Sequence, residues 1–149
     1  MNLLIRPIKQ SEMSAGSLIL QGGSLRPEME DENNVEAYWN AVEETRRRKG
    51  EIFVAELGNE IVGIVQVMVF PLFSYTGSWC CELESVHVRS DFRGKGIGGQ
   101  LLEKAEEFAR MQGCFRIQLT SRNVREDAHR FYLNAGFDQT SQGFKKMLV

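Results

Sequence analysis

A short glycine-rich stretch, Arg93-Gly94-Lys95-Gly96-Ile97-Gly98, combines the residue types that bind phosphate groups. It follows the β-branched segment Val86-His87-Val88 and opens a segment with helical periodicity. Glycines let the backbone approach a ligand closely, and the unpaired N–H groups of a first helical turn attract a phosphate. Arg93 and Lys95 add full positive charges. The stretch therefore predicts a cradle for a diphosphate, and the alternative is an ordinary tight turn between a strand and a helix.

Two other nucleotide-binding glycine loops fit this stretch less well. In a dinucleotide-binding Rossmann fold the glycines follow the strand at once, whereas residues 89–93 separate Val88 from Gly94. The acidic residue that such a fold places about 20 residues further on is absent from Leu119-Thr120-Ser121. A Walker loop needs a Ser or Thr after its lysine, but Gly96 follows Lys95. These features argue against both readings.

Two carboxylates precede the glycine stretch on the same expected strand. Glu82 and Glu84 are two residues apart, so a regular strand places them on one face, although a bulge would upset that alternation. If both are partly buried, desolvation and mutual repulsion raise the pKa of one carboxyl toward neutrality, which suits a general base. The alternative is that both are solvated charges or pair with an arginine.

Hydrophobic periodicity and turn residues place these groups in one order of strands and helices. We expect strands at 3–8, 52–57, 61–70, 79–88 and 115–120, a last strand or hairpin at 137–148, helices at 32–48, 97–111 and 124–134, and a variable segment at 10–25 that counts as a further helix. Gly58-Asn59-Glu60 is a hairpin signal. The order predicts a mixed α/β sheet with helices on both faces.

Composition bounds the class of protein. The 149 residues are 42% hydrophobic, which suits one domain over residues 1–149. The net charge is −2 and the basic cluster Arg46-Arg47-Arg48-Lys49 suits a helix C-terminus, so we expect no nucleic-acid partner. Without a signal-peptide core or a long apolar run, we expect a soluble cytoplasmic protein that does not bind a membrane. The odd set Cys80, Cys81 and Cys114 predicts neither a disulfide framework nor a metal site.

Two motifs in the second half of the chain together resemble the GCN5-related N-acetyltransferases. The family's pyrophosphate signature, Arg or Gln followed by x-x-Gly-x-Gly or Ala, is met within 93–98. Its second element, an Asn before a Tyr-bearing helix that closes in Gly-Phe, is met by the stretch 123–137, and 127–132 looks like the matching segment of aminoalkylphosphonate acetyltransferases. The resemblance implies a central mixed, mostly antiparallel, twisted sheet of six to seven strands with about four helices on both faces.

The resemblance also implies acetyl-CoA as co-substrate, with no metal. Its pyrophosphate would bind the glycine stretch 93–98, and its pantetheine arm would bind the backbone of Val86, His87 and Val88, which would also polarise the thioester carbonyl. Asn123 would contact the cofactor, and it also suits the N-cap of the following helix. The His87 side chain could instead simply fill a face of the strand.

Acetyl transfer to an amine needs a base and an acid. An alkylamine with a pKa near 10.4 costs roughly 4.6 kcal/mol to deprotonate at pH 7. By resemblance, Glu84 is the first choice of base, acting directly or through water, and Glu82 is the alternate. The resemblance also places Tyr132 beside the sulfur as general acid, and its alternative role is that of a core aromatic. A phenol with a pKa near 10 can donate a proton to a thiolate.

The function that follows is direct acetyl transfer from acetyl-CoA to the primary amine of a small molecule, in a ternary complex. The alternative is an acetyl-CoA-binding sensor or regulatory module without efficient catalysis. The acidic run Glu28–Glu32 could attract a cationic amine or form the first turn of a helix. The aromatic loop Phe70–Tyr75 could wall the acceptor pocket or form a homodimer contact, and both alternatives stay open.

Overall fold

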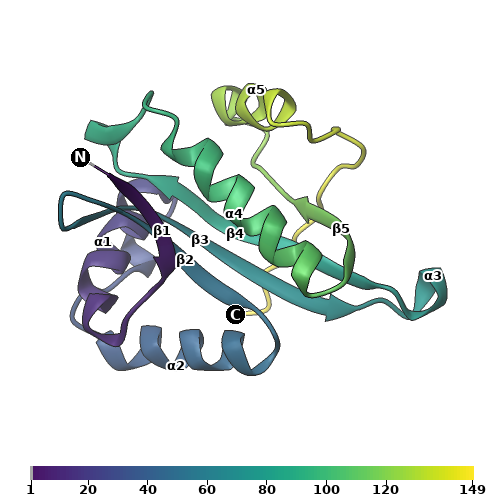
Figure 1. Ribbon diagram of the computed structural model, residues 1–149, viewed down its shortest axis with the longest axis horizontal. Coiled ribbons are helices and arrows are strands. Elements are labelled where there is room, and N and C mark those ends of the chain that lie inside the picture. The colour runs from purple at the N-terminus through teal and green to yellow at the C-terminus, as the bar shows by residue number, and fades with distance from the viewer. Residues whose placement is uncertain (1) are drawn as a thin grey trace.

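One sheet in the order β1-β2-β3-β4-β5 forms the centre of the computed structural model, which describes residues 2–149 (Figure 1). Its strands are β1 (Leu3–Pro7), β2 (Glu51–Leu57), β3 (Glu60–Pro71), β4 (Trp79–Val88) and β5 (Cys114–Leu119). The first four strands pair antiparallel, whereas β5 pairs parallel to β4. The helices are α1 (Met13–Gly23), α2 (Val35–Arg47), α3 (Ser74–Gly77), α4 (Ile97–Met111) and α5 (Glu126–Asn134), with 3-10 turns η1 (Gln10–Glu12), η2 (Pro27–Met29) and η3 (Ser90–Phe92).

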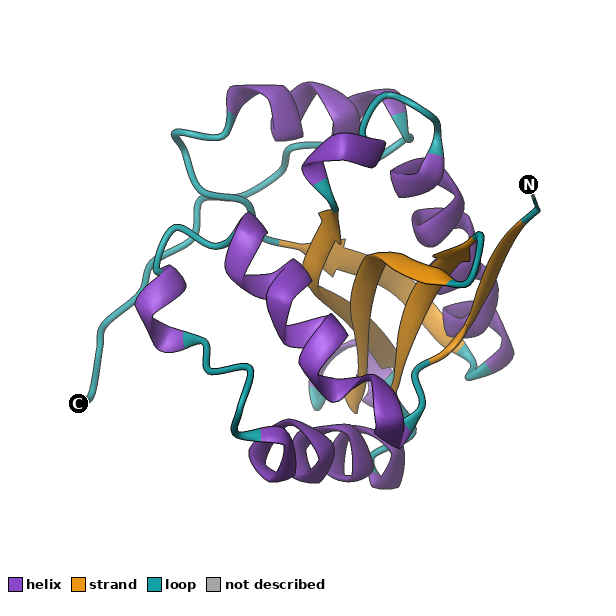
Figure 2. Cartoon of the chain, turned by 90° about the vertical axis from the view of Figure 1, so that its left-hand side faces the viewer, coloured by secondary structure: helices purple, strands orange, loops and turns teal. Residues whose placement is uncertain are grey.

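Helices cover both faces of the sheet (Figure 1, Figure 2), and each face carries its own hydrophobic core. Side chains alternate along β2, so Phe53 and Ala55 pack under α4. Their neighbours Ile52 and Val54 point the other way and pack with residues of α1 and α2. The expected mixed α/β architecture with helices on both faces is therefore confirmed. Packing on both faces holds β4 and β5 in position within the sheet.

Local sequence signals predicted several elements correctly. The helix expected at 97–111 is α4, and its apolar stripe is buried at Ile97, Leu101, Leu102, Ala105 and Ala109. The hairpin expected at 58–60 joins β2 to β3, with Gly58 and Asn59 both in the left-handed region at φ 58° and 65°. This is the conformation that a tight two-residue hairpin turn requires.

The expected strand or hairpin at 137–148 is wrong, and the sheet has five strands rather than six to seven. Residues 135–149 lie in no helix or strand, and every residue from 138 onward is exposed. The run 138–143 is polar, so pairing it as a strand would bury little apolar surface to offset the loss of chain entropy. The variable segment 10–25, expected as a further helix, folds as η1 and α1.

The helices of residues 2–149 all fall short of the length and apolar character that a membrane crossing requires. Cys80, Cys81 and Cys114 are free thiols. Among the same described residues, no group of three His, Cys, Asp or Glu side chains is placed to hold a metal ion.

Candidate active site

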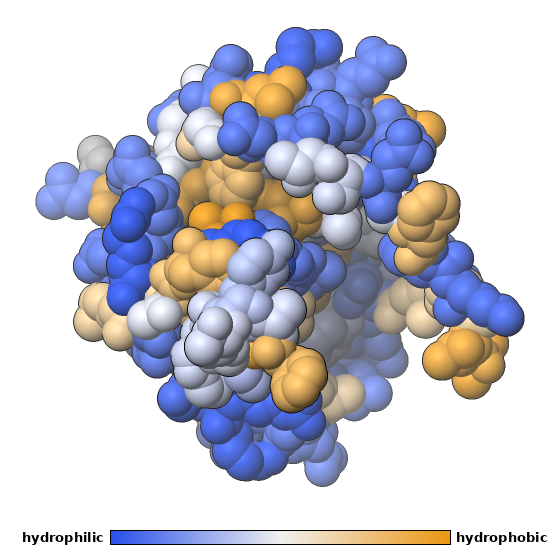
Figure 3. Space-filling view, turned by 90° about the vertical axis from the view of Figure 1, so that its right-hand side faces the viewer, coloured by the Kyte–Doolittle hydropathy of each residue, from blue (hydrophilic) through white to orange (hydrophobic). Residues whose placement is uncertain are grey.

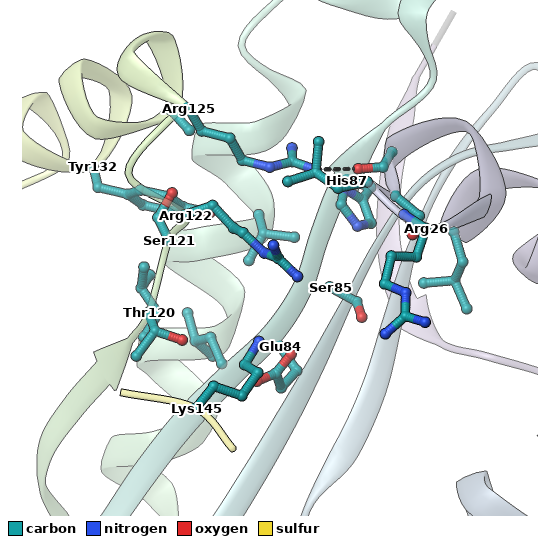
Figure 4. Close-up of a pocket in the computed structure, with 18 of the residues that line it drawn as sticks. Arg26, Glu84, Ser85, His87, Thr120, Ser121, Arg122, Arg125, Tyr132 and Lys145 are labelled. Atoms are coloured by element: carbon teal, nitrogen blue, oxygen red, sulfur yellow. Dashed lines mark hydrogen bonds between the residues drawn. The ribbon is translucent and has the colours of Figure 1, made fainter. Parts of the chain in front are cut away.

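A cavity opens where β4 and β5 stop pairing. The parallel ladder runs from Trp79 opposite Cys114 to Leu83 opposite Leu119, and β4 then continues alone on that side to Val88. Backbone groups of 84–88 on this side therefore have no neighbouring strand to bond. A cavity of about 320 Å³ lies here, lined by the end of α1, by β4, by the loop after β5, by α5 and by the C-terminal segment (Figure 4).

A bulge in β4 lies at this opening. Gln66 of β3 faces Glu84, but Ile64 faces His87, so β4 carries one more residue than β3 over this interval. Ser85 takes the left-handed conformation, with φ 55°. The bulge breaks the two-residue alternation, and five consecutive residues of β4, from Leu83 to His87, line the cavity.

The end of the ladder between β4 and β5 gives the two carboxylates different surroundings, because Glu82 lies opposite Gln118 of β5 whereas Glu84 lies beyond the last paired residue, Leu83. Glu82 accepts a hydrogen bond of 2.7 Å from the Gln118 amide of β5 and does not line the cavity. Glu84 does line it: its side chain stays accessible to solvent in the open cleft but is crowded by protein atoms. That partial burial raises the pKa of Glu84, the charge of Glu82 adds to the rise, and Lys145 opposes it. Of the two, Glu84 has the better placement for a general base.

Tyr132 reaches the same cavity from α5. Its ring packs against Phe131 and Phe137, with ring centroids 5.2 and 5.9 Å away. Burial raises the pKa of Tyr132, Arg125 opposes the rise, and the charge of Glu84 adds to it. The phenol therefore keeps its proton at neutral pH and has one to donate.

His87 and Arg125 meet the end of α1 at one side of the cavity. A Cβ atom added to Gly23 would lie 2.2 Å from His87 Nδ1, so the imidazole packs directly on the backbone there. Burial lowers the pKa of His87 to about 4, with further lowering by Arg125 and Arg93. The Arg125 guanidinium donates to the Gly23 carbonyl oxygen at 2.5 Å (Figure 4). His87 is therefore neutral at pH 7. It lies beside the hydrogen bond from Arg125 to Gly23, which joins the start of α5 to the end of α1.

The glycine stretch has the conformation that a cradle needs. Gly94 and Gly96 adopt left-handed φ values of 77° and 80°, which a residue with a side chain rarely takes. A Cβ atom at Gly98 would lie 3.1 Å from the Phe131 ring, so α5 packs close to the start of α4. No side chain caps α4, which leaves the first N–H groups of the helix open. The Arg93 Nε donates to the Val88 carbonyl oxygen at 3.1 Å. Lys95 is exposed, and Ile97 is buried.

Asn123 lies in the loop between β5 and α5, with an exposed side chain. Helix α5 begins at Glu126 and its N-cap position is Arg125, without a side-chain capping bond. The alternative reading of Asn123 as the N-cap is therefore wrong. Asn123 is also not among the residues that line the cavity.

Two other regions singled out from the sequence are placed differently. The acidic run Glu28–Glu32 precedes α2 instead of forming its first turn, and Glu30 lines the cavity while accepting a 2.8 Å bond from the Tyr38 hydroxyl. None of residues 70–75 lines the cavity. Their loop lies at the α3 end of the molecule, where Tyr75 packs on Phe115 at 5.3 Å. On that face, hydrophobic surface is scattered among hydrophilic surface (Figure 3).

The cations of the cavity carry no sequence motif, so sequence reasoning missed them. Arg26, Arg122, Arg125 and Lys145 all line the cavity. They come from the segment after α1, the loop after β5 and the C-terminal segment. Only the folded chain brings these segments together.

Comparison with known proteins identifies the class. The sequence profile of the acetyltransferase (GNAT) family matches residues 22–137, and the chain belongs to this family. Over 90 residues it is 40% identical to aminoalkylphosphonate N-acetyltransferase of Salmonella typhimurium, covering 60% of this chain and 57% of the relative. Over 99 residues it is 31% identical to glucosamine 6-phosphate N-acetyltransferase of Trypanosoma brucei brucei, covering 64% of this chain and 65% of the relative. The chain thus spans less than two thirds of the length of either curated relative.

A solved structure covers nearly the whole chain. The crystal structure of a transcriptional regulator from Bacillus halodurans C-125 superposes with a TM-score of 0.90 at 35% sequence identity. The match covers 99% of this chain and all of that one. The fold of this chain therefore matches that structure over nearly its whole length.

Proposed function

We propose that the protein transfers the acetyl group of acetyl-CoA to the primary amine of a small molecule, directly and in a ternary complex. The observation that carries the proposal is the free edge of β4 at 84–88, which opens into a cavity that also holds Glu84 and Tyr132. The family to which the chain belongs agrees with it. A base candidate, an acid candidate and exposed backbone donors thus share one site.

The coenzyme would lie along the carboxyl end of β4. The open amides of 93–98, with Arg93 and Lys95, suit the pyrophosphate. The unpaired edge at Val86, His87 and Val88 suits the amide-bearing pantetheine arm and the thioester carbonyl, whose oxygen gains charge during transfer. Asn123, in the loop that precedes α5, is proposed as a further cofactor contact.

The chemical step uses one proton acceptor and one donor. Glu84 takes a proton from the ammonium, directly or through water, because its raised pKa brings it toward neutral pH. Glu82 stays the alternate base. The neutral nitrogen bonds to the acetyl carbon, the carbon–sulfur bond breaks, and the thiolate takes the phenol proton of Tyr132. After the bond to carbon forms, the nitrogen loses its second surplus proton to solvent, while Tyr132 recovers a proton from solvent and Glu84 releases the one it took. The products are therefore an amide, a free thiol and one proton.

The decisive experiment combines binding and turnover. Acetyl-CoA is titrated calorimetrically, and a panel of small amines is screened for acetyl-CoA consumption. Tyr132→Phe should lower kcat by about 10²- to 10⁴-fold, the range for removal of a general acid. Tyr75→Phe, at an exposed tyrosine of α3 outside the cavity, is the matched control. Absence of both coenzyme binding and turnover would end the proposal.

A regulatory module that binds acetyl-CoA without efficient catalysis is the second candidate. The observation that favours it is the 35% identical structure described as a transcriptional regulator, which covers 99% of this chain. The same experiment separates the two. A regulatory module would bind acetyl-CoA, acetylate no amine in the panel, and keep its coenzyme affinity in Tyr132→Phe.

A further inference from the structure

The cavity holds more positive than negative side chains. Four cations line it, at Arg26, Arg122, Arg125 and Lys145, against two carboxylates at Glu30 and Glu84. His87, the remaining titratable base in the wall, is neutral at pH 7 because burial lowers its pKa to about 4. The chain as a whole has a net charge of −2, so the positive excess is a local property of this site.

Several of these charges already have partners inside the protein. The Arg125 guanidinium donates to the Gly23 carbonyl, and Glu30 accepts from the Tyr38 hydroxyl. Arg26 has one loose contact, 3.5 Å to Glu28, in which both side chains are about half exposed or more. Within residues 2–149, neither Arg122 nor Lys145 has a carboxylate oxygen within 4.0 Å of its side-chain nitrogens.

The three cations without a firm partner point into the same space. Figure 4 shows Arg26, Arg122 and Lys145 reaching from three separate segments toward the part of the cavity beside Ser85 and Glu84. Lys145 is close enough to Glu84 to oppose the rise of its pKa, yet it forms no ion pair with it. Cations gathered in a concave site attract and orient an anionic ligand, and arginine suits planar or tetrahedral oxyanions in particular.

We propose that the acceptor amine also carries a negatively charged oxyanion, a phosphonate, phosphate monoester or carboxylate, a few bonds from its nitrogen. The inference rests on the proposed acetyl transfer and narrows its acceptor. The oxyanion binds Arg26 and Lys145, while the amine end turns to Glu84. A dicationic amine meets repulsion from the same side chains. The acidic run Glu28–Glu32 thus does not define the acceptor, because the cavity wall beside it is cationic overall.

The first test compares acceptors of similar size and different charge. At saturating acetyl-CoA, kcat/KM is measured for 2-aminoethylphosphonate, O-phosphoethanolamine, β-alanine, propylamine and 1,3-diaminopropane. At least one anionic amine should exceed propylamine by tenfold or more, the diamine should be slowest, and added salt should shrink the difference. The three anionic amines separate phosphonate, phosphate and carboxylate. Equal or faster turnover of propylamine or the diamine overturns the proposal.

The second test removes the cations. Arg26→Gln and Lys145→Gln should each raise KM for the preferred anionic amine about tenfold and reduce its advantage over propylamine by the same factor. Lys146→Gln is the matched control for Lys145, because Lys146 is exposed and does not line the cavity. Arg47→Gln, at an exposed arginine of α2, serves the same purpose for Arg26.

The coenzyme's own phosphates are the competing use of these charges. Acetyl-CoA affinity is therefore titrated for each variant. Weakening of that affinity by the factor seen for the amine assigns the cations to the coenzyme and overturns the proposal. If no amine is acetylated, that result contradicts the proposed transfer reaction but not the charge preference of the cavity. The charge preference is then tested by titrating 2-aminoethylphosphonate and propylamine against the CoA complex. Tighter binding of the phosphonate supports the inference, and equal or weaker binding overturns it.

Discussion

The two halves of β4 differ in almost every physical respect. Residues 79–83 pair with strands on both sides, and Cys80, Cys81 and Leu83 are buried. Residues 84–88 pair only with β3 and contain the bulge, and Glu84 to His87 line the cavity, which Leu83 touches from the paired half. One continuous strand thus holds the sheet together with its first half and offers backbone and polar side chains to ligands with its second. Substitutions in the two halves should therefore affect different measurements.

The largest effect is expected in the paired half. Leu83 is 2% exposed within the core under α4, so Leu83→Ala removes a buried side chain and leaves a cavity. The free energy of unfolding should fall by about 2–5 kcal/mol, as measured by denaturant unfolding. Leu4→Ala, at a leucine of β1 that is 50% exposed, is the control and should cost far less. Equal losses of unfolding free energy in the two variants would contradict the claim that the buried, paired half of β4 contributes most to stability.

His87, in the open half, should make stability depend on pH. Its pKa is about 4 in the folded protein and near 6.5 when unfolded, so the unfolded chain binds more protons between those values. Stability from this group is complete above pH 6.5 and is lost as pH falls to 4, with a limit of roughly 3 kcal/mol.

The chain's two histidines allow a matched comparison for that prediction. His87→Gln should flatten the pH dependence of unfolding between pH 4 and 6.5 relative to the original protein. His129→Gln, in α5, should preserve it, since the His129 ring already bonds the Arg122 carbonyl oxygen outside the cavity. An unchanged slope in His87→Gln would contradict the buried neutral imidazole.

Glu84 should affect catalysis and leave folding nearly unchanged. Because its pKa is raised, kcat at saturating amine should increase as pH rises through that pKa and the carboxyl loses its proton. Glu84→Gln should lower kcat by about 100-fold and abolish this increase. Glu82→Gln, two residues earlier in the paired half, should retain it. A pH increase that persists in Glu84→Gln and disappears in Glu82→Gln would reverse the assignment.

The smallest effect is expected at the bulge itself. Ser85 has a left-handed φ of 55°, which costs a residue with a side chain roughly 1–2 kcal/mol, whereas glycine takes it freely. Glycine also loses more chain entropy on folding, so Ser85→Gly should raise the free energy of unfolding by less than about 1 kcal/mol. Ser85→Val should lower it, because β-branched residues resist this conformation. A clear loss of stability in Ser85→Gly would point to a role for the hydroxyl.

Features of the fold that depend on local sequence could be predicted, whereas features that depend on how strands pair could not. Strand 79–88, the glycine turns at Gly94 and Gly96, and helix 97–111 follow from local periodicity and from backbone angles that glycine favours. The prediction of a last strand was wrong because residues 138–143 are all polar or glycine and offer no apolar face to bury. Nothing in a single sequence marks where β5 ends relative to β4.

The candidate site divides in the same way. The family resemblance named Glu84, His87 and Tyr132, and these three residues line one cavity, while their roles stay predictions. The resemblance put Glu84 before Glu82, but the difference in their surroundings depends on where β5 stops pairing with β4, which no local pattern encodes. The convergence of Arg26, Arg122 and Lys145 depends on three segments far apart in the chain, and no local pattern encodes it.

The hydrogen bond from Arg125 to the Gly23 carbonyl joins residues 102 positions apart, across a gap that no strand bridges. A molecule that enters between β4 and β5 and takes up this guanidinium competes with Gly23 for it. Occupancy of the gap and attachment of α1 to α5 are then thermodynamically linked, and each must alter the other's free energy by the same amount. A ligand that takes the Arg125 guanidinium from Gly23 would therefore loosen the attachment of α1 to α5.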